Sequence, residues 1–171
     1  MKKGTSSPFL FTKIKPMLVT ESMIQNIVSE KLVGTDCFMV EVKVHPGRIS
    51  VLLDKPSGIR IEECAEVNRY LNHKLEESGA LEHYNIEVSS PGMEAPLKVL
   101  QQYQRRIGKV VSVITKDRIR KEGVLKNADE SRIELEETFS EKNNGKKDKR
   151  TELRTILTNE IKETKVLFSF K

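Results

Sequence analysis

The sequence predicts an α+β protein with two domains, and three observations support this. In the first half of the chain, apolar residues recur first at helical spacing and then in alternation, which predicts the order αββαβ. In the second half, short alternating segments separated by turn residues predict a small SH3-like or Sm-like β-barrel. Between them, Pro91 and Pro96 enclose a short segment in which each ring fixes its own φ angle. We therefore expect a sandwich of a three-stranded sheet and two helices at residues 17–92, a linker at 93–98 and a barrel at 99–171.

The N-terminal domain is expected to open with a helix. Thr20 is a suitable N-cap because its hydroxyl can accept a backbone amide, and Gly34 supplies a stop. Residues 38–53 then alternate between apolar and polar side chains on either side of a Pro-Gly turn, which predicts a β-hairpin with one buried face. A second helix, with an apolar stripe along one side, is expected to begin at Ile61.

The third strand of this domain, residues 84–89, ends abruptly. Pro91 has no backbone donor and restricts Ser90 to extended geometry, and Gly92 offers a positive φ angle. The chain is therefore expected to turn out of the sheet and to form a semi-rigid hinge between the domains. The hinge residues are Ser89, Ser90, Pro91, Gly92 and Pro96.

The second domain is predicted from weaker patterns. A short helix is expected before Gly108, and Gly123 is expected to allow a bend within a strand. We expect residues 138–150 to form a polar loop with its tip at residues 143–145. The predicted strands are residues 109–115, 119–126, 132–136, 153–157 and 164–170.

The charge differs between the two domains. Residues 17–97 carry seven basic and thirteen acidic side chains, whereas residues 98–171 carry nineteen basic and twelve acidic ones. A basic surface suits phosphate and an acidic surface suits a basic protein. Two ordinary solvated surfaces would give the same split, so charge alone does not assign partners.

We find no motif for catalysis, a metal or a cofactor. The pair Ser89-Ser90 lacks a nucleophile elbow and an evident base, and the three histidines lack the short spacing of a zinc motif. No Walker A loop, dinucleotide fingerprint or Gly-x-x-Gly loop occurs. Cys64 falls on the apolar stripe of a predicted helix, so we expect it to be a small buried residue. The sequence therefore predicts a protein that is not an enzyme.

The chain lacks an apolar run of the length of a membrane span, and residues 1–16 lack a signal-peptide core. We therefore expect a cytoplasmic protein. Residues 1–16 are rich in Lys, Ser and Pro without a regular period, which predicts a disordered tail.

Three stretches of the first domain carry a family resemblance. They are Glu-Val-Ser-Ser-Pro-Gly at 87–92, Asp54 with the loop at Gly58, and Glu-Glu-Cys-Ala-Glu-Val at 62–67. Together they resemble the ribosome maturation factor RimP family of bacteria, over about residues 17–171. The resemblance implies an α/β domain followed by a small β-barrel. It also implies a role in maturing the small (30S) ribosomal subunit, association with the free subunit, and contact with the small-subunit protein near the decoding centre.

Two features depart from the family pattern. The family usually has an Asp-Arg pair before the second proline, whereas this chain has Glu94 and Ala95, so the contact of that arginine is not carried over. Residues 1–16 precede the resemblance, which begins at Met17. We expect these residues to be either a dispensable tail or the result of a misplaced start codon.

The candidate contacts follow from the charge split. Candidate contacts to the subunit or its rRNA are Arg105, Arg106, Arg118, Arg120, Lys121, Lys146, Lys147 and Arg150. Candidate contacts to a ribosomal protein are Glu62, Glu63 and Glu66. Tyr103 is the only nearby aromatic residue outside the expected core, so base stacking has little support and RNA contact is expected to be electrostatic.

An alternative function belongs to a different class. An Sm-like RNA-binding regulator would form rings by pairing the edges of neighbouring barrels, and the last predicted strand, Thr164 to Phe170, is long and apolar enough to pair in this way. We expect a monomer, which would exclude the ring.

Overall fold

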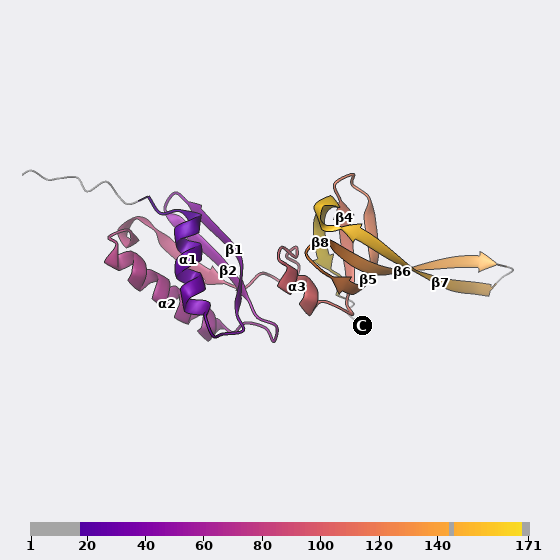
Figure 1. Cartoon of the computed structure of the whole chain (residues 1–171), viewed down its shortest axis with the longest axis horizontal. Helices are drawn as coiled ribbons and strands as arrows, with labels where there is room; N and C mark the ends of the chain where they lie inside the picture. The colour runs from indigo at the N-terminus through magenta and orange to yellow at the C-terminus, as the bar shows by residue number, and fades with distance from the viewer. Residues whose placement is uncertain (1–17, 144–145, 169–171) are drawn as a thin grey trace, which may run out of the picture.

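A computed structural model describes residues 18–143 and 146–168, so the tail predicted at 1–16 lies outside the described part of the chain (Figure 1). Its elements are α1 (Glu21–Leu32), β1 (Phe38–His45), β2 (Arg48–Asp54), α2 (Ile61–Glu77), the 3₁₀ helix η1 (Leu81–His83), β3 (Asn85–Ser89), α3 (Leu100–Arg105), β4 (Val110–Thr115), β5 (Arg120–Ala128), β6 (Arg132–Asn143), β7 (Lys146–Leu157), the 3₁₀ helix η2 (Thr158–Glu160) and β8 (Ile161–Val166). Elements α1 to β3 form the first domain, and α3 to β8 form the second.

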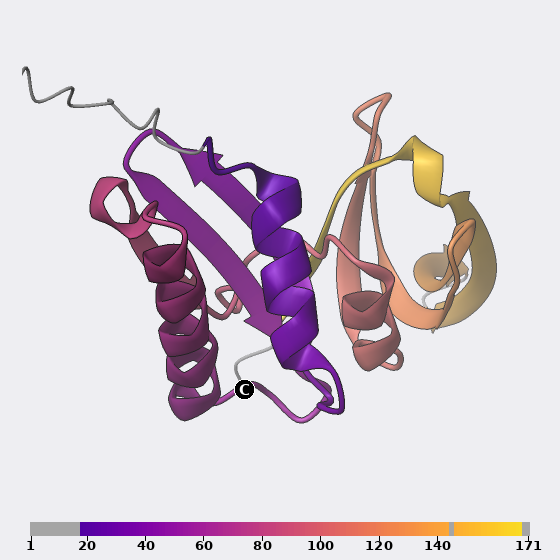
Figure 2. The ribbon, with the colours of Figure 1, turned by 60° about the vertical axis from the view of Figure 1, so that its left-hand side comes forward.

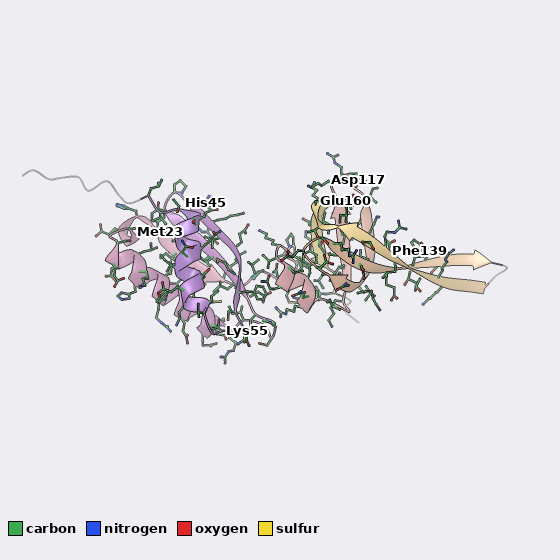
Figure 3. The ribbon with its side chains drawn as sticks, viewed as in Figure 1. Met23, His45, Lys55, Asp117, Phe139 and Glu160 are labelled. Atoms are coloured by element: carbon green, nitrogen blue, oxygen red, sulfur yellow. The ribbon has the colours of Figure 1, made fainter. Side chains whose placement is uncertain are left out.

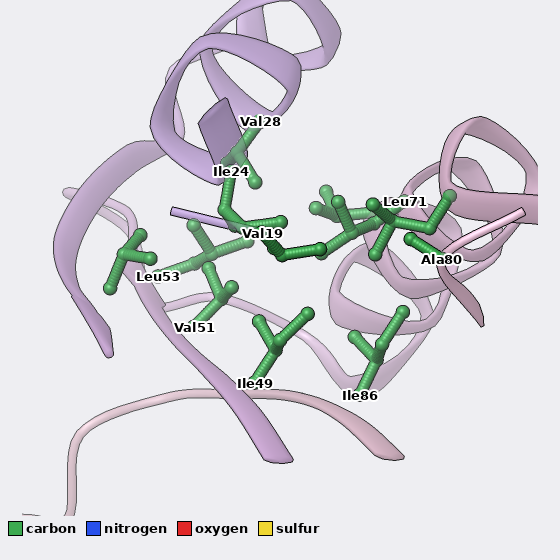
Figure 4. Packing of buried hydrophobic residues seen from close by; sticks show 12 residues of the cluster. Val19, Ile24, Val28, Ile49, Val51, Leu53, Leu71, Ala80 and Ile86 are labelled. Carbon is green, nitrogen blue, oxygen red and sulfur yellow. The ribbon is translucent and has the colours of Figure 1, made fainter. Parts of the chain in front are cut away.

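The first domain confirms the order αββαβ. Its sheet has the strand order β1-β2-β3, with β1 antiparallel to β2 and β2 parallel to β3. Helix α2 makes the crossover that two parallel strands require, and both helices cover the same face of the sheet (Figure 2). Ile24 and Val28 of α1 and Leu71 of α2 pack against strand residues such as Ile49 (Figure 4).

The two helices of the first domain are capped at their N-termini by different kinds of side chain. The Thr20 hydroxyl accepts the amide of Met23 at 3.2 Å, so the predicted N-cap of α1 is confirmed. In α2, the carboxylate of Glu63 accepts the amide of Arg60 at 2.9 Å and so satisfies a backbone donor at the start of the helix.

The second domain is a five-stranded antiparallel sheet in the order β7-β6-β5-β4-β8. Its buried side chains include Val111, Val113, Leu125, Ile133 and Leu135. In the described residues the strand pairings form one open row with β7 and β8 at its edges, so the predicted closed barrel is not confirmed. The last strand ends at Val166; residues 167 and 168 of the predicted strand are not part of it, and residues 169 and 170 lie outside the described residues.

The polar loop predicted at 138–150 is wrong, because most of it is strand. β6 continues to Asn143 and β7 begins at Lys146, and the two remain in register from Arg132↔Leu157 to Asn143↔Lys146. The β5–β6 pairing stops at Val124↔Glu136, so residues 137–143 and 146–152 pair only with each other. We call these residues the ribbon; it projects away from the rest of the domain (Figure 1).

Two glycines behave differently from one another. Gly92 does not have the expected positive φ angle, and the connector instead turns through a hydrogen bond of 3.0 Å from the amide of Ala95 to the carbonyl of Gly92.

Gly123 lies where β6 leaves β5, and a Cβ atom there would be 2.6 Å from the carbonyl oxygen of Glu136. The close approach of two backbones therefore requires glycine at position 123.

We expect Gly123→Ala to destabilise the second domain by roughly 1–3 kcal/mol, because the added methyl group must displace the backbone of β6. The measurement is the free energy of unfolding in denaturant. Gly92→Ala is the matched control, since a Cβ at Gly92 meets nothing within 4 Å, and its effect should stay within about 0.5 kcal/mol. Equal losses in the two variants would contradict the assignment.

Candidate interaction surfaces and the domain junction

An ion pair joins the two domains. Asp54 is the last residue of β2, and its Oδ1 accepts a hydrogen bond from Nη1 of Arg105 at 2.6 Å. The same oxygen accepts the amide of Lys55 at 2.8 Å. The two side chains are 12% and 23% exposed, so water is largely excluded and screens the pair less than an ion pair at the surface. The domain junction therefore includes a specific charged contact between residues 51 positions apart.

A second ion pair and a backbone hydrogen bond lie along the connector. Nζ of Lys98 lies 2.7 Å from Oε2 of Glu41 on β1, and this hydrogen bond lowers the pKa of the Glu41 carboxyl group. The amide of Leu97 donates to the carbonyl oxygen of Thr164 on β8 at 2.8 Å. The end of the connector is thus fixed onto the second domain, and the hinge at residues 89–96 stays a prediction.

Helix α3 presents Arg105 to the first domain. The side chain of Gln102 is buried and accepts the amide of Lys98 at 2.8 Å, which fixes the start of this short helix. Tyr103 is also buried and packs with the apolar residues of the second domain, and burial raises the pKa of its hydroxyl. The expectation that Tyr103 lies outside the core is therefore wrong.

The predicted basic contacts fall in three separate places. Arg105 and Arg106 lie at the domain junction, where Arg105 is paired with Asp54 and burial lowers the pKa of Arg106. Arg118, Arg120 and Lys121 lie at the β4–β5 turn, which Asp117 marks in Figure 3. Lys146, Lys147 and Arg150 belong to β7 in the ribbon. The structure thus does not gather the eight residues into one patch.

The β4–β5 turn holds an arginine in an unusual conformation. Arg118 has a φ angle of 67°, in the left-handed region that favours glycine. Hydrogen bonds enforce the turn: the amide of Arg118 donates to the carbonyl of Thr115 at 2.9 Å, and the amide of Thr115 donates to the carbonyl of Ile119 at 3.0 Å. The side chain of Arg118 is exposed at the tip of this turn.

The three predicted acidic contacts have different surroundings. Glu63 contacts Nζ of Lys55 at 2.8 Å in addition to its capping role, and these hydrogen bonds lower the pKa of its carboxyl group. Glu66 lies 3.9 Å from Lys31, and Glu62 is exposed in the first turn of α2. Glu63 therefore serves the local structure, whereas Glu62 and Glu66 face solvent.

Within the described residues, no group of three or more His, Cys, Asp or Glu is placed to hold a metal ion. Burial raises the pKa of the Cys64 thiol, which disfavours the reactive thiolate. None of the helices in the described part of the chain is long and apolar enough to cross a membrane.

Known proteins resemble this chain along most of its length. The family model for the RimP N-terminal domain matches residues 23–94, which span most of the first domain and part of the connector. A ribosome maturation factor RimP from Porphyromonas gingivalis is 34% identical over 149 residues, which are 85% of this chain and 97% of the relative. The chain belongs to the RimP family. A second ribosome maturation factor RimP, from Cytophaga hutchinsonii, is 34% identical over 168 residues, covering 92% of this chain and 99% of the relative.

Membership of the RimP family confirms the resemblance seen in the sequence and supports a part in ribosome maturation. The names of these relatives describe factors of ribosome maturation. Sequence reasoning missed the pairing of Asp54 with Arg105, although the resemblance included Asp54. A single acidic residue at the end of a strand gives no sign of its partner in another domain.

We expect the Asp54–Arg105 pair to show a coupling free energy of about 1 kcal/mol or more in a double-mutant cycle. The variants are Asp54→Ala, Arg105→Ala and the double variant, and the measurement is the free energy of unfolding. Arg48 and Glu87, 58% and 50% exposed within one sheet, form the control pair, and their coupling should not exceed about 0.5 kcal/mol. A junction coupling no larger than the control value would argue against a specific contact between the domains.

Proposed function

We propose that this protein is a non-catalytic assembly factor that acts in the cytoplasm to mature the small (30S) ribosomal subunit. The observation that carries the proposal is the match to ribosome maturation factors over 97% and 99% of their lengths. The protein binds the free subunit as a monomer, through a small-subunit ribosomal protein near the decoding centre and through rRNA. This division of partners is supported by the acidic balance of the first domain and the basic balance of the second.

The structure narrows the residues that this proposal uses. Arg105 is held in a largely buried ion pair with Asp54, whereas Arg118, Arg120 and Arg150 are exposed, so the rRNA contact rests on the β4–β5 turn and the ribbon. Arg118 is the leading residue, because a strained conformation at an exposed turn tip is retained where glycine would be free of strain. On the first domain, the protein contact rests on Glu62 and Glu66.

The second domain also supports an SH3-like barrel. Strands β4 and β8, the first and last of the domain, are antiparallel neighbours, as in a small barrel, and closure would further require β7 and β8, the two edges of the row, to pair. An Sm-like ring is less well supported, because it would pair the edge of β8 with another copy. The carbonyl of Thr164 on that edge already accepts the amide of Leu97.

We expect cells that lack the protein to accumulate immature small subunits. A sedimentation profile of ribosomal particles should show more free small subunits and fewer complete ribosomes than in cells that contain it. Co-sedimentation of the protein should be with the free small subunit. An unchanged profile would contradict a role in small-subunit maturation, and co-sedimentation with the large subunit would redirect the proposal.

We expect binding to rRNA to weaken with salt, because each phosphate contact releases condensed counterions. The slope of log affinity against log salt should be roughly 0.7–0.9 per phosphate contacted. Replacing Arg118 and Arg120 together by Glu should weaken binding and reduce that slope. Replacing Arg69 and Lys74 on α2 by Glu makes the same change in charge on the acidic domain and should have a smaller effect. An affinity that does not change with salt would show that the β4–β5 turn does not contact rRNA. The proposed role in assembly would not be affected by that result.

The variant Arg118→Gly separates the effect of the Arg118 charge on RNA affinity from the effect of its backbone strain on stability. It removes the cation but relieves the left-handed conformation, so RNA affinity should fall while the free energy of unfolding rises by about 0.5–1 kcal/mol. Arg120→Gly is its control, because it removes the cation from a strand and should lower stability.

A further inference from the structure

The strand register gives the ribbon two faces. Residues directly opposite each other in an antiparallel pair share a face, and successive residues along one strand alternate between the faces. The pairing runs without a shift from Glu137↔Glu152 to Asn143↔Lys146, so every residue of the ribbon can be placed on one face or the other. One face continues the side of β6 that buries Ile133 and Leu135, and the other continues the outer side of the sheet.

The face that continues the core side is acidic, and we call it the acidic face. It consists of Glu137, Phe139, Glu141, Asn143, Lys146, Asp148, Arg150 and Glu152. Four of these residues are acidic and two are basic. Arg150 contacts Glu152 at 3.1 Å, and Arg154, just below the ribbon, contacts Glu137 at 2.7 Å. This face therefore has no surplus of positive charge.

The outer face contains the other basic residues of the ribbon, and we call it the lysine face. It consists of Thr138, Ser140, Lys142, Lys147, Lys149 and Thr151. Three of these residues are lysines, the other three carry hydroxyl groups, and none of the six is acidic. Lys149 is exposed opposite Ser140. Among the described side chains, the ion pairs that involve ribbon residues all lie on the acidic face.

The lysine face keeps its positive charge down to the base of the ribbon. The next pair on the same side is Glu136↔Leu153, and the carboxylate of Glu136 lies 3.7 Å from Nζ of Lys126. Lysines on a two-stranded ribbon also hinder pairing between the edges of different molecules. That role needs charge on the strands but on neither face in particular, so it does not explain why the two faces differ.

The residue types on the lysine face favour phosphate over protein as the partner. Lys and Ser are depleted in protein–protein interfaces, whereas Lys, Ser and Thr commonly donate hydrogen bonds to the phosphates of nucleic acids. Side chains on one face of a strand are roughly 7 Å apart, so Lys147 and Lys149 can reach separate phosphates. Phe139, labelled in Figure 3, lies on the acidic face, so the lysine face offers no ring for base stacking.

We propose that the lysine face of the ribbon binds the sugar–phosphate backbone of RNA. This inference rests on the proposed rRNA contact and narrows it from the whole ribbon to one of its faces. Lys142, Lys147 and Lys149 neutralise phosphates, and the hydroxyl groups between them donate hydrogen bonds. Lys146 and Arg150, on the acidic face, do not take part. Because the contact is to the backbone, it does not depend on the base sequence.

Two double variants of β7 test the face. Lys147→Gln with Lys149→Gln removes two cations from the lysine face, and Lys146→Gln with Arg150→Gln removes two from the acidic face. The measurement is the affinity for a mixed-sequence RNA duplex of about 20 base pairs at several salt concentrations. The first variant should bind about tenfold more weakly, and its slope of log affinity against log salt should fall by roughly 1.8, for two phosphate contacts. The second should lose less than about twofold and keep the slope.

A third variant separates loss of charge from loss of fold. Lys147→Arg with Lys149→Arg keeps both cations and should bind RNA like the unaltered protein, and thermal unfolding should be the same in all variants. A second duplex of unrelated sequence should give the same affinities as the first.

Equal losses in the two Gln variants, or an unchanged affinity in the lysine-face variant, would overturn the inference. If replacement of Arg118 and Arg120 by Glu still weakened RNA binding in that case, the proposed function would survive without it. A lysine-face variant that binds RNA normally but no longer co-sediments with the small subunit would also overturn it, because the face would then contact an acidic protein surface.

Discussion

The arrangement of this protein depends on a charged contact made where water is largely excluded. Each domain has its own apolar core, and the connector supplies only a few residues between them. The contact of Arg105 with Asp54 and that of Lys98 with Glu41 give these otherwise independent units a defined relative placement. Charged pairs are directional, so the junction holds the two domains in one orientation. Because these pairs also weaken as ionic strength rises, the contact between the domains is less permanent than a shared apolar core would be.

The first domain could be predicted from sequence because its elements each bury one face. Alternation around Ile49 and helical spacing around Leu71 report that burial directly, so element type and order were correct. The ribbon could not be predicted in this way. The side chains of residues 138–140 and 149–151 are exposed on both faces, so burial imposes no hydrophobic period there. A strand held by cross-strand pairing such as Thr138↔Thr151 then has the composition of a loop.

Candidate sites were harder to predict than elements, because charge and aromatic content do not reveal burial. Arg105 and Arg118 look alike in the sequence, yet one is paired at the domain junction and the other is exposed at a turn. Tyr103 was expected outside the core but is buried by the short helix α3, whereas Phe139, which fell within the predicted polar loop, belongs to a strand and stays exposed. Partners distant in sequence decide these outcomes, and the backbone of Gly92 shows that even a local turn signal can be satisfied differently.

The close approach at Gly123 gives the ribbon a mechanical property. Where β6 leaves β5, the two backbones meet without an intervening side chain, so the ribbon tilts about this point. The ribbon beyond it is roughly 20 Å long. A tilt of about 10° at this point would displace the far end by roughly 3–4 Å, about the rise of one strand residue. The precision with which the ribbon reaches a partner is therefore set by packing at its base, far from the atoms that make the contact.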